Sequence, residues 1–277
     1  MMTNSEVNNL LLLAIRSAYM AGKTIMQFYG SDRLVIKRKK DFSPLTLADQ
    51  SAHEVIMKLL EPANIPVISE EGDQYDYEVR KNWEYFWLVD PLDGTKEFLK
   101  RNGEFTVNIA LIEHNLPIMG IVYAPAVDQL YWASQEYGSY LLNTNLLKEQ
   151  LQINVPDLIR FSEKLPSSKK RELITIVASR SHINFLTNNY IKHLKKKHGK
   201  VDVLSKGSSL KFCIVADGSA DIYPRFGPTM EWDTAAGQAV AVFSGCKVTR
   251  YNTVDILTYN KKDLHNPLFI VSRDRII

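Results

Sequence analysis

Hydrophobic residues near the start of the chain recur at the spacing of an α-helix. Apolar positions between Leu11 and Tyr29 fall about one turn apart, which predicts one long amphipathic helix. Thr3 and Glu6 have the spacing of a capping box at its start, and Gly30 provides a stop. The first 30 residues are therefore expected to form a helix that packs on a core.

The next segments predict a second helix followed by strands. The pattern after Thr46 indicates a helix closed by Pro62, with Asp49 in its first turn at capping-box spacing from Thr46. Short apolar runs at 67–69 and 85–89 predict strands, and the second run is apolar throughout, as in a strand covered on both faces.

Residues 104–143 alternate between apolar and polar positions. Turn residues interrupt the alternation at 115–117, at 125–128 and at Gly138, which predicts an antiparallel meander. From 143 to 171 the chain is polar, basic and without period, and we interpret it as the passage between two halves, residues 1–160 and 161–277.

The second half alternates between the two kinds of element. Strands are predicted at 173–178, 201–204, 220–226, 247–251 and 268–272, and helices at 183–197, 209–216 and 233–243. This alternation indicates a layered α/β arrangement. The basic run Lys192–Lys200 is interpreted as the solvated end of a helix, where cations suit the helix dipole.

Composition places the chain among ordinary globular proteins. Its 277 residues are 45% hydrophobic, and 34 Lys and Arg face 31 Asp and Glu. A net charge of +3 is too small and too dispersed for a nucleic-acid binder and hints at most at an anionic ligand.

Two further features bear on the location of the protein. Cys213 and Cys246 lie in apolar surroundings without metal-ligand spacing, which argues against a disulfide framework or a zinc site and favours reduced thiols in the cytoplasm. The apolar run Leu10–Ile15 is too short for a signal peptide or a membrane span. An integral membrane segment is therefore not expected, while peripheral association at an inner membrane stays open.

Candidate chemistry begins where the apolar run 85–89 meets two acids. Asp90 and Asp93 follow the predicted strand, and Gly94-Thr95 turns the chain into a helix whose amide groups can hold a phosphate. Alternatively, Asp93-Gly94 only makes a turn that Asp90 caps.

Other acids occupy similar places. Glu70 and Glu71 follow the predicted strand 67–69, and Asp233 begins a helix. Each has a structural alternative, a solvated acidic pair for the glutamates and an N-cap for Asp233. Their shared position at the ends of buried elements, where open α/β sheets place ligands, favours a common site.

Converging carboxylates need a cation, because two like charges about 4 Å apart cost roughly 4 kcal/mol even at an effective dielectric constant of about 20. Oxygen ligands select a hard cation such as Mg²⁺, which keeps waters and phosphate oxygens in its shell. Two such ions can stabilise the attacking and leaving oxygens of phosphoryl transfer to water.

These motifs resemble a known family. "DPLDGTKEF", with "SEE" before it and "WDTAAG" after it, is similar to the signatures of the inositol monophosphatase superfamily of magnesium-dependent, lithium-sensitive phosphatases. "DGTKEF" and "GSSLK" resemble its 3'(2'),5'-bisphosphate nucleotidase branch, and the resemblance covers most of the chain. It implies an αβαβα sandwich of the sugar-phosphatase type with mixed sheets.

The resemblance also implies roles for single residues. Glu70, Asp90 and the carbonyl of Leu92 would bind a first Mg²⁺, and Asp90, Asp93 and Asp233 a second. Glu71 would assist a weaker third ion. Gly94 and Thr95 would cradle the scissile phosphate, and Thr95 with Asp49 and Glu70 would activate water.

The second half would select the substrate. The residues implied to bind the nucleotide there are His182, Ser208, Lys211 and Arg225. Lys211 and Arg225 suit the phosphate that does not react. The alternative for Ser208 is a helix cap, and a lone histidine such as His182 is more often a capping or surface residue.

The implied activity is hydrolysis of the 3'-phosphate of adenosine 3',5'-bisphosphate to AMP and phosphate, with 3'-phosphoadenylyl sulfate as a possible second substrate. An inositol or sugar monophosphatase is the alternative enzyme, and a non-catalytic nucleotide-sensing or RNA-binding protein the alternative of another class. The expected partner is a small phosphorylated nucleotide, the protein being a monomer or homodimer.

Overall fold

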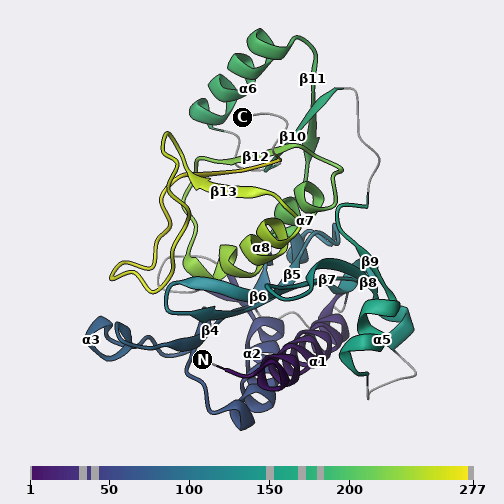
Figure 1. The fold of residues 1–277 in the computed structure, drawn as a ribbon, viewed down its shortest axis with the longest axis vertical. Helices are drawn as coiled ribbons and strands as arrows, with labels where there is room; N and C mark the ends of the chain where they lie inside the picture. Colours follow the sequence, from purple (N-terminus) through teal and green to yellow (C-terminus); the bar gives the residue numbers. More distant parts are fainter. Residues whose placement is uncertain are drawn as a thin grey trace.

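The computed structural model describes residues 2–30, 36–38, 44–147, 153–167, 173–179 and 184–273. These residues form five layers, helices and sheets in alternation, as Figure 1 shows from α1 and α2 at the bottom to α6 at the top. Four clusters of buried apolar side chains fill the interfaces between successive layers. The predicted αβαβα sandwich with mixed sheets is confirmed.

The first layer holds the two predicted N-terminal helices, α1 (Asn4–Phe28) and α2 (Leu47–Leu60). The capping box is present, since the amide of Glu6 donates to Thr3 Oγ1 (3.3 Å) and the amide of Thr3 to Glu6 Oε2 (2.7 Å). Both helices bury apolar side chains, among them Leu11 and Ile56, against one face of the larger sheet.

The larger sheet has seven strands within the described residues, in the order β3-β4-β5-β6-β7-β8-β9. Their bounds are Val67–Ser69, Tyr85–Asp93, Thr106–Glu113, Leu116–Ala124, Gln129–Ser134, Gly138–Asn143 and Ser162–Lys164. β3 runs parallel to β4, and every later pair is antiparallel, so the predicted meander is confirmed.

The third layer consists of α7 (Leu210–Ala216) and α8 (Glu231–Phe243). Their apolar residues pack on both sheets, and Figure 1 shows the two helices between them. The smaller sheet follows, with strand order β11-β10-β12-β14-β13. Its strands are Val201–Ser205, Ile174–Ala178, Ile222–Arg225, Phe269–Ser272 and Lys247–Arg250, partly parallel and partly antiparallel.

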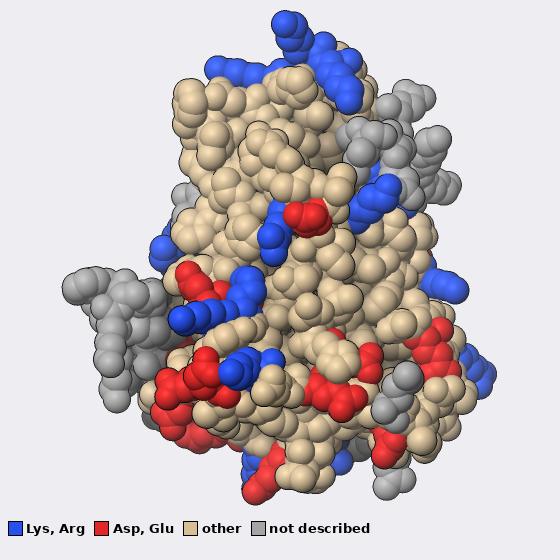
Figure 2. Space-filling model, turned by 60° about the vertical axis from the view of Figure 1, so that its left-hand side comes forward, with Lys and Arg blue, Asp and Glu red and all other residues tan. Residues whose placement is uncertain are grey.

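The last layer is α6 (Phe185–His198), which covers the outer face of the smaller sheet through Ile191 and Leu194. Its basic end, Lys195–His198, is exposed, as predicted for a solvated helix end. Figure 2 shows Lys and Arg gathered at this top end, whereas acidic and basic side chains lie close together over the lower part.

The remaining elements are short. They are β1 (Ile36–Arg38), β2 (Pro44–Thr46), η1 (Glu61–Ala63), α3 (Tyr77–Arg80), α4 (Thr95–Leu99), η2 (Pro125–Val127), η3 (Thr144–Leu147) and α5 (Val155–Arg160). The pattern between 143 and 171 predicted no element, yet α5 and β9 lie there, and β9 extends the larger sheet beside β8. Cys213 and Cys246 are both buried as thiols. None of the helices in the described residues combines the length and the apolar character that a membrane span requires.

Helix α8 lies almost directly on strand β6. A Cβ atom at Gly120 would come within 2.6 Å of the carbonyl oxygen of Ala236 and 2.7 Å of the Cβ of Ala239. This position therefore needs glycine, because no side chain fits between strand and helix. The close contact fixes the height of α8 above the sheet.

We expect Gly120→Ala to lower the free energy of unfolding by about 1 to 3 kcal/mol, because the added methyl group overpacks this contact. Urea unfolding measures the change. Gly227→Ala is the control, since a Cβ at Gly227 would meet only the guanidinium carbon of Arg225 at 4.0 Å. Equal stability of both variants would show that α8 is free to shift.

Candidate active site

A β-bulge in strand β4 places two aspartates on one side of the sheet. Asp90 pairs with Asn108 and Asp93 with Thr106, so three steps along β4 match two steps along β5. In a regular strand, residues three apart point to opposite faces, and the one extra residue of a bulge returns Asp93 to the face of Asp90. The predicted strand ended at Val89, four residues too early, because the sequence gave no sign that pairing continues through the bulge.

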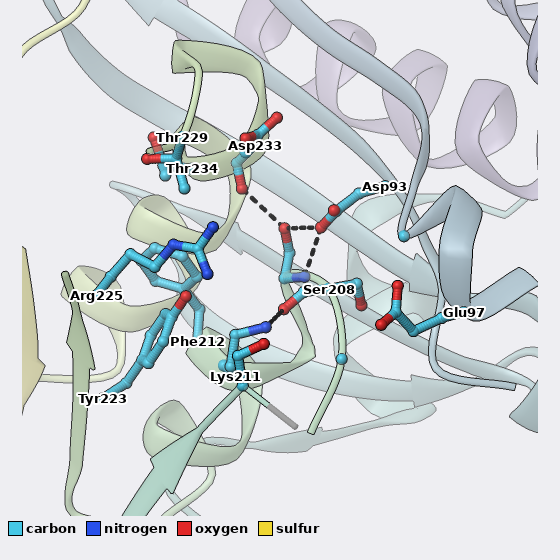
Figure 3. A pocket seen from close by; sticks show the side chains of 14 residues that line it. Asp93, Glu97, Ser208, Lys211, Phe212, Tyr223, Arg225, Thr229, Asp233 and Thr234 are labelled. Atoms are coloured by element: carbon cyan, nitrogen blue, oxygen red, sulfur yellow. Dashed lines mark hydrogen bonds between the residues drawn. The ribbon is translucent and has the colours of Figure 1, made fainter. Parts of the chain in front are cut away.

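Asp93 is held by residues from the second half of the chain. Its Oδ2 atom accepts a hydrogen bond from the amide of Ser209 (2.6 Å) and lies 2.7 Å from the Ser209 hydroxyl. Dashed lines at Asp93 in Figure 3 mark these contacts. Asn108 Nδ2 donates to the same oxygen at 3.5 Å. The site is therefore assembled from elements far apart in the sequence.

The turn after Asp93 places a hydroxyl beside a buried carboxylate. Gly94 has φ +92° and a Cβ there would lie 3.2 Å from the carbonyl oxygen of Glu104, so the tight turn into α4 needs glycine. Thr95 Oγ1 then donates to Asp49 Oδ1 at 3.2 Å and lies 3.4 Å from the carbonyl oxygen of Leu92. Asp49, in the first turn of α2, is buried.

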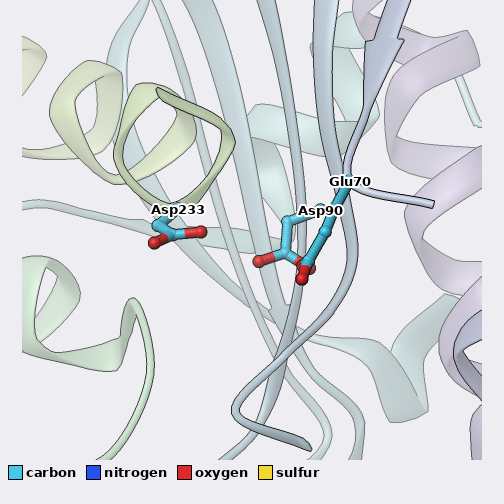
Figure 4. A group of neighbouring side chains, drawn as sticks. All are labelled: Glu70, Asp90 and Asp233. Carbon is cyan, nitrogen blue, oxygen red and sulfur yellow. The ribbon is translucent and has the colours of Figure 1, made fainter. Parts of the chain in front are cut away.

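Three acids from separate elements converge. Glu70 follows β3, Asp90 lies in β4 and Asp233 lies in the first turn of α8, and each offers an oxygen within 4.8 Å of the others. Figure 4 shows Glu70 and Asp90 side by side, with Asp233 reaching toward them from the start of α8. Asp93 is not one of the three but lies close enough to act on their charges.

Asp233 does not occupy the N-cap that we considered as its structural alternative. Helix α8 begins two residues earlier, at Glu231, so Asp233 is its third residue. Its Oδ2 atom accepts a hydrogen bond from the amide of Met230 (2.9 Å), which fixes the carboxyl group at the start of the helix. Asp233 therefore stabilises the helix start and faces the acidic cluster with the same side chain.

The electrostatics of the cluster favour a cation. Burial, followed by repulsion from Glu70, Asp93 and Asp233, raises the pKa of Asp90 well above its ordinary value. Burial and repulsion from Asp93 and Glu70 raise the pKa of Asp233 to about 8. The ion pairs of the described residues include none to Asp90 or Asp233. A carboxylate-only donor set with this excess of negative charge fits a hard divalent cation.

A pocket lined mostly by the second half of the chain adjoins the acidic cluster, with which it shares Asp233. Lys211 is buried on α7, its Nζ atom donates to the carbonyl oxygen of Ser208 (2.5 Å), and it lies 5.4 Å from the ring centre of Tyr223. Burial lowers the pKa of Lys211 to about 8. Arg225, in β12, donates to the carbonyl oxygen of Pro228 (2.8 Å). Figure 3 shows Lys211 and Arg225 facing the acids across the pocket.

The structure places some of the predicted site residues in the pocket and others outside it. Residues that line the pocket include Asp93, Gly94, Ser208, Lys211, Arg225 and Asp233. Among the described residues, the hydroxyl of Ser208 makes only a long contact, 3.4 Å, with the amide of Leu210, and the N-cap of α7 is Ser209. The capping alternative for Ser208 therefore receives little support. Glu71 follows Glu70, and its amide donates to Ser69 Oγ at 3.4 Å. His182 lies outside the described residues.

Some residues of the site were not predicted. Further residues that line the pocket are Glu97, Ser179, Gly207, Ser209, Phe212, Tyr223, Thr229 and Thr234. Several belong to motifs we had noted, such as Glu97 in "DGTKEF" and Ser209 in "GSSLK". The position of each residue within its motif could have indicated it, but its partners lie too far along the chain to be inferred from spacing.

The sequence of the chain is similar to those of known proteins. Residues 6–276 match the sequence profile described as the inositol monophosphatase family. The chain is 45% identical over 256 residues to the 3'(2'),5'-bisphosphate nucleotidase CysQ of Shigella flexneri, covering 91% of this chain and 95% of that protein. It is 44% identical to the protein of the same name from Escherichia coli strain K12, with the same coverage.

A solved structure is similar over nearly the whole fold. The crystal structure of CysQ from Bacteroides thetaiotaomicron, described as a bacterial member of the inositol monophosphatase family, superimposes with a TM-score of 0.89. The two sequences are 46% identical, and the match covers 97% of this chain and 98% of the other.

The raised pKa values predict how a divalent cation stabilises the fold. Asp90 and Asp233 have folded-state pKa values above the ordinary 3.8, so the cation-free protein loses stability as the pH rises from about 3.8 through the folded pKa values. We expect saturating Mg²⁺ to raise the melting temperature by about 5 °C at pH 8 and by less at pH 5.5, where protons compete. Thermal unfolding with EDTA or Mg²⁺ measures both values.

Asp90→Asn is the matched variant, because it removes one charge of the cluster at nearly constant volume. It is expected to melt at a higher temperature than the wild type in EDTA and to gain little from Mg²⁺. A stability gain of Asp90→Asn over the wild type in EDTA that is no larger at pH 8 than at pH 5.5 would contradict the repulsion among these acids.

Proposed function

The chain belongs to the inositol monophosphatase family, and we propose that within this family it is a magnesium-dependent 3'(2'),5'-bisphosphate nucleotidase. Adenosine 3',5'-bisphosphate and water would give AMP and phosphate, and 3'-phosphoadenylyl sulfate is a second candidate substrate. The observation that carries the proposal is the acidic cluster of Glu70, Asp90 and Asp233 in a chain 45% identical to a named nucleotidase over 91% of its length.

The cation ligands are proposed from the acidic cluster. Glu70, Asp90 and the carbonyl oxygen of Leu92 would hold a first Mg²⁺, and Asp90, Asp93 and Asp233 a second. Glu71 would assist a third ion. These ions supply positive charge that stabilises the phosphoryl oxygens and makes water easier to deprotonate.

Thr95 and Asp49 can move the proton of the attacking water. The hydroxyl of Thr95 donates to Asp49 Oδ1 (3.2 Å), which leaves the lone pairs of Thr95 Oγ1 free to accept a hydrogen bond from water. The water oxygen would attack phosphorus while the bond to the 3'-oxygen breaks. One water proton would pass through Thr95 to Asp49, and the 3'-oxygen of AMP would gain a proton from solvent.

The chain's own residues would hold the substrate at two points. Gly94 and Thr95, at the start of α4, would cradle the phosphate that reacts. Lys211 and Arg225 would bind the second phosphate, the arginine through its planar fork and the lysine as a point charge. Ser208, beside Lys211, would contact the same part of the nucleotide, and a role for His182 stays a prediction.

The proposal also covers the substrate class, the compartment and the oligomeric state that the sequence predicts. The protein would act on a small phosphorylated nucleotide in the cytoplasm, as a monomer or homodimer. Two buried cysteine thiols suit a reducing compartment.

Turnover tests the proposed activity directly. Purified protein with Mg²⁺ is expected to release phosphate from adenosine 3',5'-bisphosphate, and Asp93→Asn to lower kcat/KM by at least about 100-fold, because it replaces a proposed cation ligand at constant volume. Asp73→Asn, an exposed acid three residues beyond Glu70, is the control and should retain activity. Near-wild-type activity of Asp93→Asn would exclude its proposed role.

Substrate choice tests the binding residues separately. Lys211→Met keeps the aliphatic stem but removes the charge, so we expect KM for the bisphosphate to rise about 10- to 100-fold. Turnover of inositol 1-phosphate should change by less than about threefold, because it has no second phosphate to lose. The exposed Lys195→Met serves as the control. Preference of the wild type for inositol 1-phosphate would support the alternative enzyme, and nucleotide binding without turnover would indicate a sensor.

A further inference from the structure

We propose that Ser209 is a positioning residue, which orients Asp93 and thereby joins the nucleotide-binding turn of α7 to the cation site. This inference rests on the proposed function, since it gives Asp93 a task in holding a cation. Neither the resemblance of the motifs nor the cluster of three acids had indicated Ser209.

Ser209 contacts Asp93 through two groups at once. Its amide lies 2.6 Å and its hydroxyl oxygen 2.7 Å from the same carboxylate oxygen, Oδ2, and the serine is 2% exposed. Hydrogen bonds to a charged carboxylate are among the stronger ones, and burial protects these two from water. With two donors on Oδ2, the other oxygen of Asp93 stays available for a cation.

The hydroxyl of Ser209 is itself fixed. Asn108 Nδ2 donates to Ser209 Oγ at 2.9 Å, and the carbonyl oxygen of Asp233 lies 2.8 Å from the same atom. The hydroxyl has one hydrogen to donate, and two acceptors lie within reach of it, the carboxylate of Asp93 and the carbonyl oxygen of Asp233. Ser209 therefore lies between two of the proposed cation ligands and contacts both.

Asn108 is oriented by the same contact. It is 1% exposed, and its Oδ1 atom has no hydrogen-bond partner among the described residues, while its Nδ2 atom faces Ser209 and Asp93. Leaving a buried acceptor unpaired is destabilising. In exchange, the amide group of Asn108 directs its donor at Ser209 and Asp93.

The backbone before Ser209 is shaped to bring it there. A Cβ at Gly207 would meet the carbonyl oxygen of Glu104 at 2.8 Å, so the turn passes too close to the first half for any side chain. Ser208 has φ +46°, a left-handed conformation that is unusual for a residue other than glycine, and the Lys211 ammonium group donates to its carbonyl oxygen. These features direct Ser208 and Lys211 to the pocket and Ser209 to Asp93.

One short turn therefore carries both substrate and cation functions. Movement of the turn on nucleotide binding would move the partner of Asp93, and occupation of the cation site would hold the turn. The turn thus connects the two parts of the proposed site through Ser209.

Ser209→Ala tests this inference, because it removes the hydroxyl and keeps the hydrogen bond from the backbone amide of residue 209 to Asp93. We expect the dissociation constant for Mg²⁺, measured by calorimetry without substrate, to rise about 10-fold, the usual effect of removing a partner of a metal ligand. The Mg²⁺ concentration for half-maximal activity should rise in parallel, while kcat at saturating Mg²⁺ should stay within about threefold of the wild type.

Two further variants separate positioning from general damage. Ser17→Ala removes an equally buried hydroxyl that donates to the carbonyl oxygen of Leu13, far from the site, and should leave Mg²⁺ affinity unchanged. Asn108→Ala should weaken Mg²⁺ binding less than Ser209→Ala does. The dissociation constant of the double variant Ser209→Ala/Asn108→Ala for Mg²⁺ should lie within about twofold of that of Ser209→Ala, because both side chains act on one carboxylate.

Each outcome bears on one of the two proposals. Mg²⁺ binding by Ser209→Ala equal to that of the wild type would overturn the role of Ser209 and leave the nucleotidase activity standing. Weakened Mg²⁺ binding in a protein that does not hydrolyse the bisphosphate would support the positioning role and reject the proposed substrate. A wild-type protein that binds no Mg²⁺ would overturn both the cation site and this inference.

Discussion

The structure depends on holding several carboxyl groups together that repel one another. Asp90 is buried among Glu70, Asp93 and Asp233, and this environment raises its pKa far above that of an exposed aspartate. Such an arrangement persists only where the surrounding fold is stable enough to impose it, and a bound cation would offset the repulsion. The layered packing is therefore the condition on which the site exists.

Elements of several layers hold these carboxyl groups together, because their ends lie at one site. Strand β4 contributes Asp90 and Asp93, the residue after β3 is Glu70, and helix α8 contributes Asp233. Helix α2 brings Asp49, and the turn before α7 brings Ser209. Apolar clusters on both sides of the larger sheet fix the heights of these elements, and Gly120 lets α8 approach closely. The core thus determines distances among polar groups that have little affinity for one another.

Local signals in the sequence predicted most of the elements, and the family motifs predicted the acids. Thr3 and Glu6 form their capping box within four residues, and the meander follows from alternation alone. The end of β4 was wrong because the bulge at Asp90–Asp93 depends on pairing with β5, which no local pattern reveals. Ser209 and Asp93 are 116 positions apart, so their contact arises only from the packed fold.

Helix α8 both packs between the two sheets and contributes an acid to the site. Its small side chains, Ala235, Ala236 and Ala239, fill the space between the two sheets, while its first turn presents Asp233. A larger side chain on this face would push α8 away from β6 and carry Asp233 with it. Changes made here for heat resistance would therefore also alter the geometry of the acidic cluster.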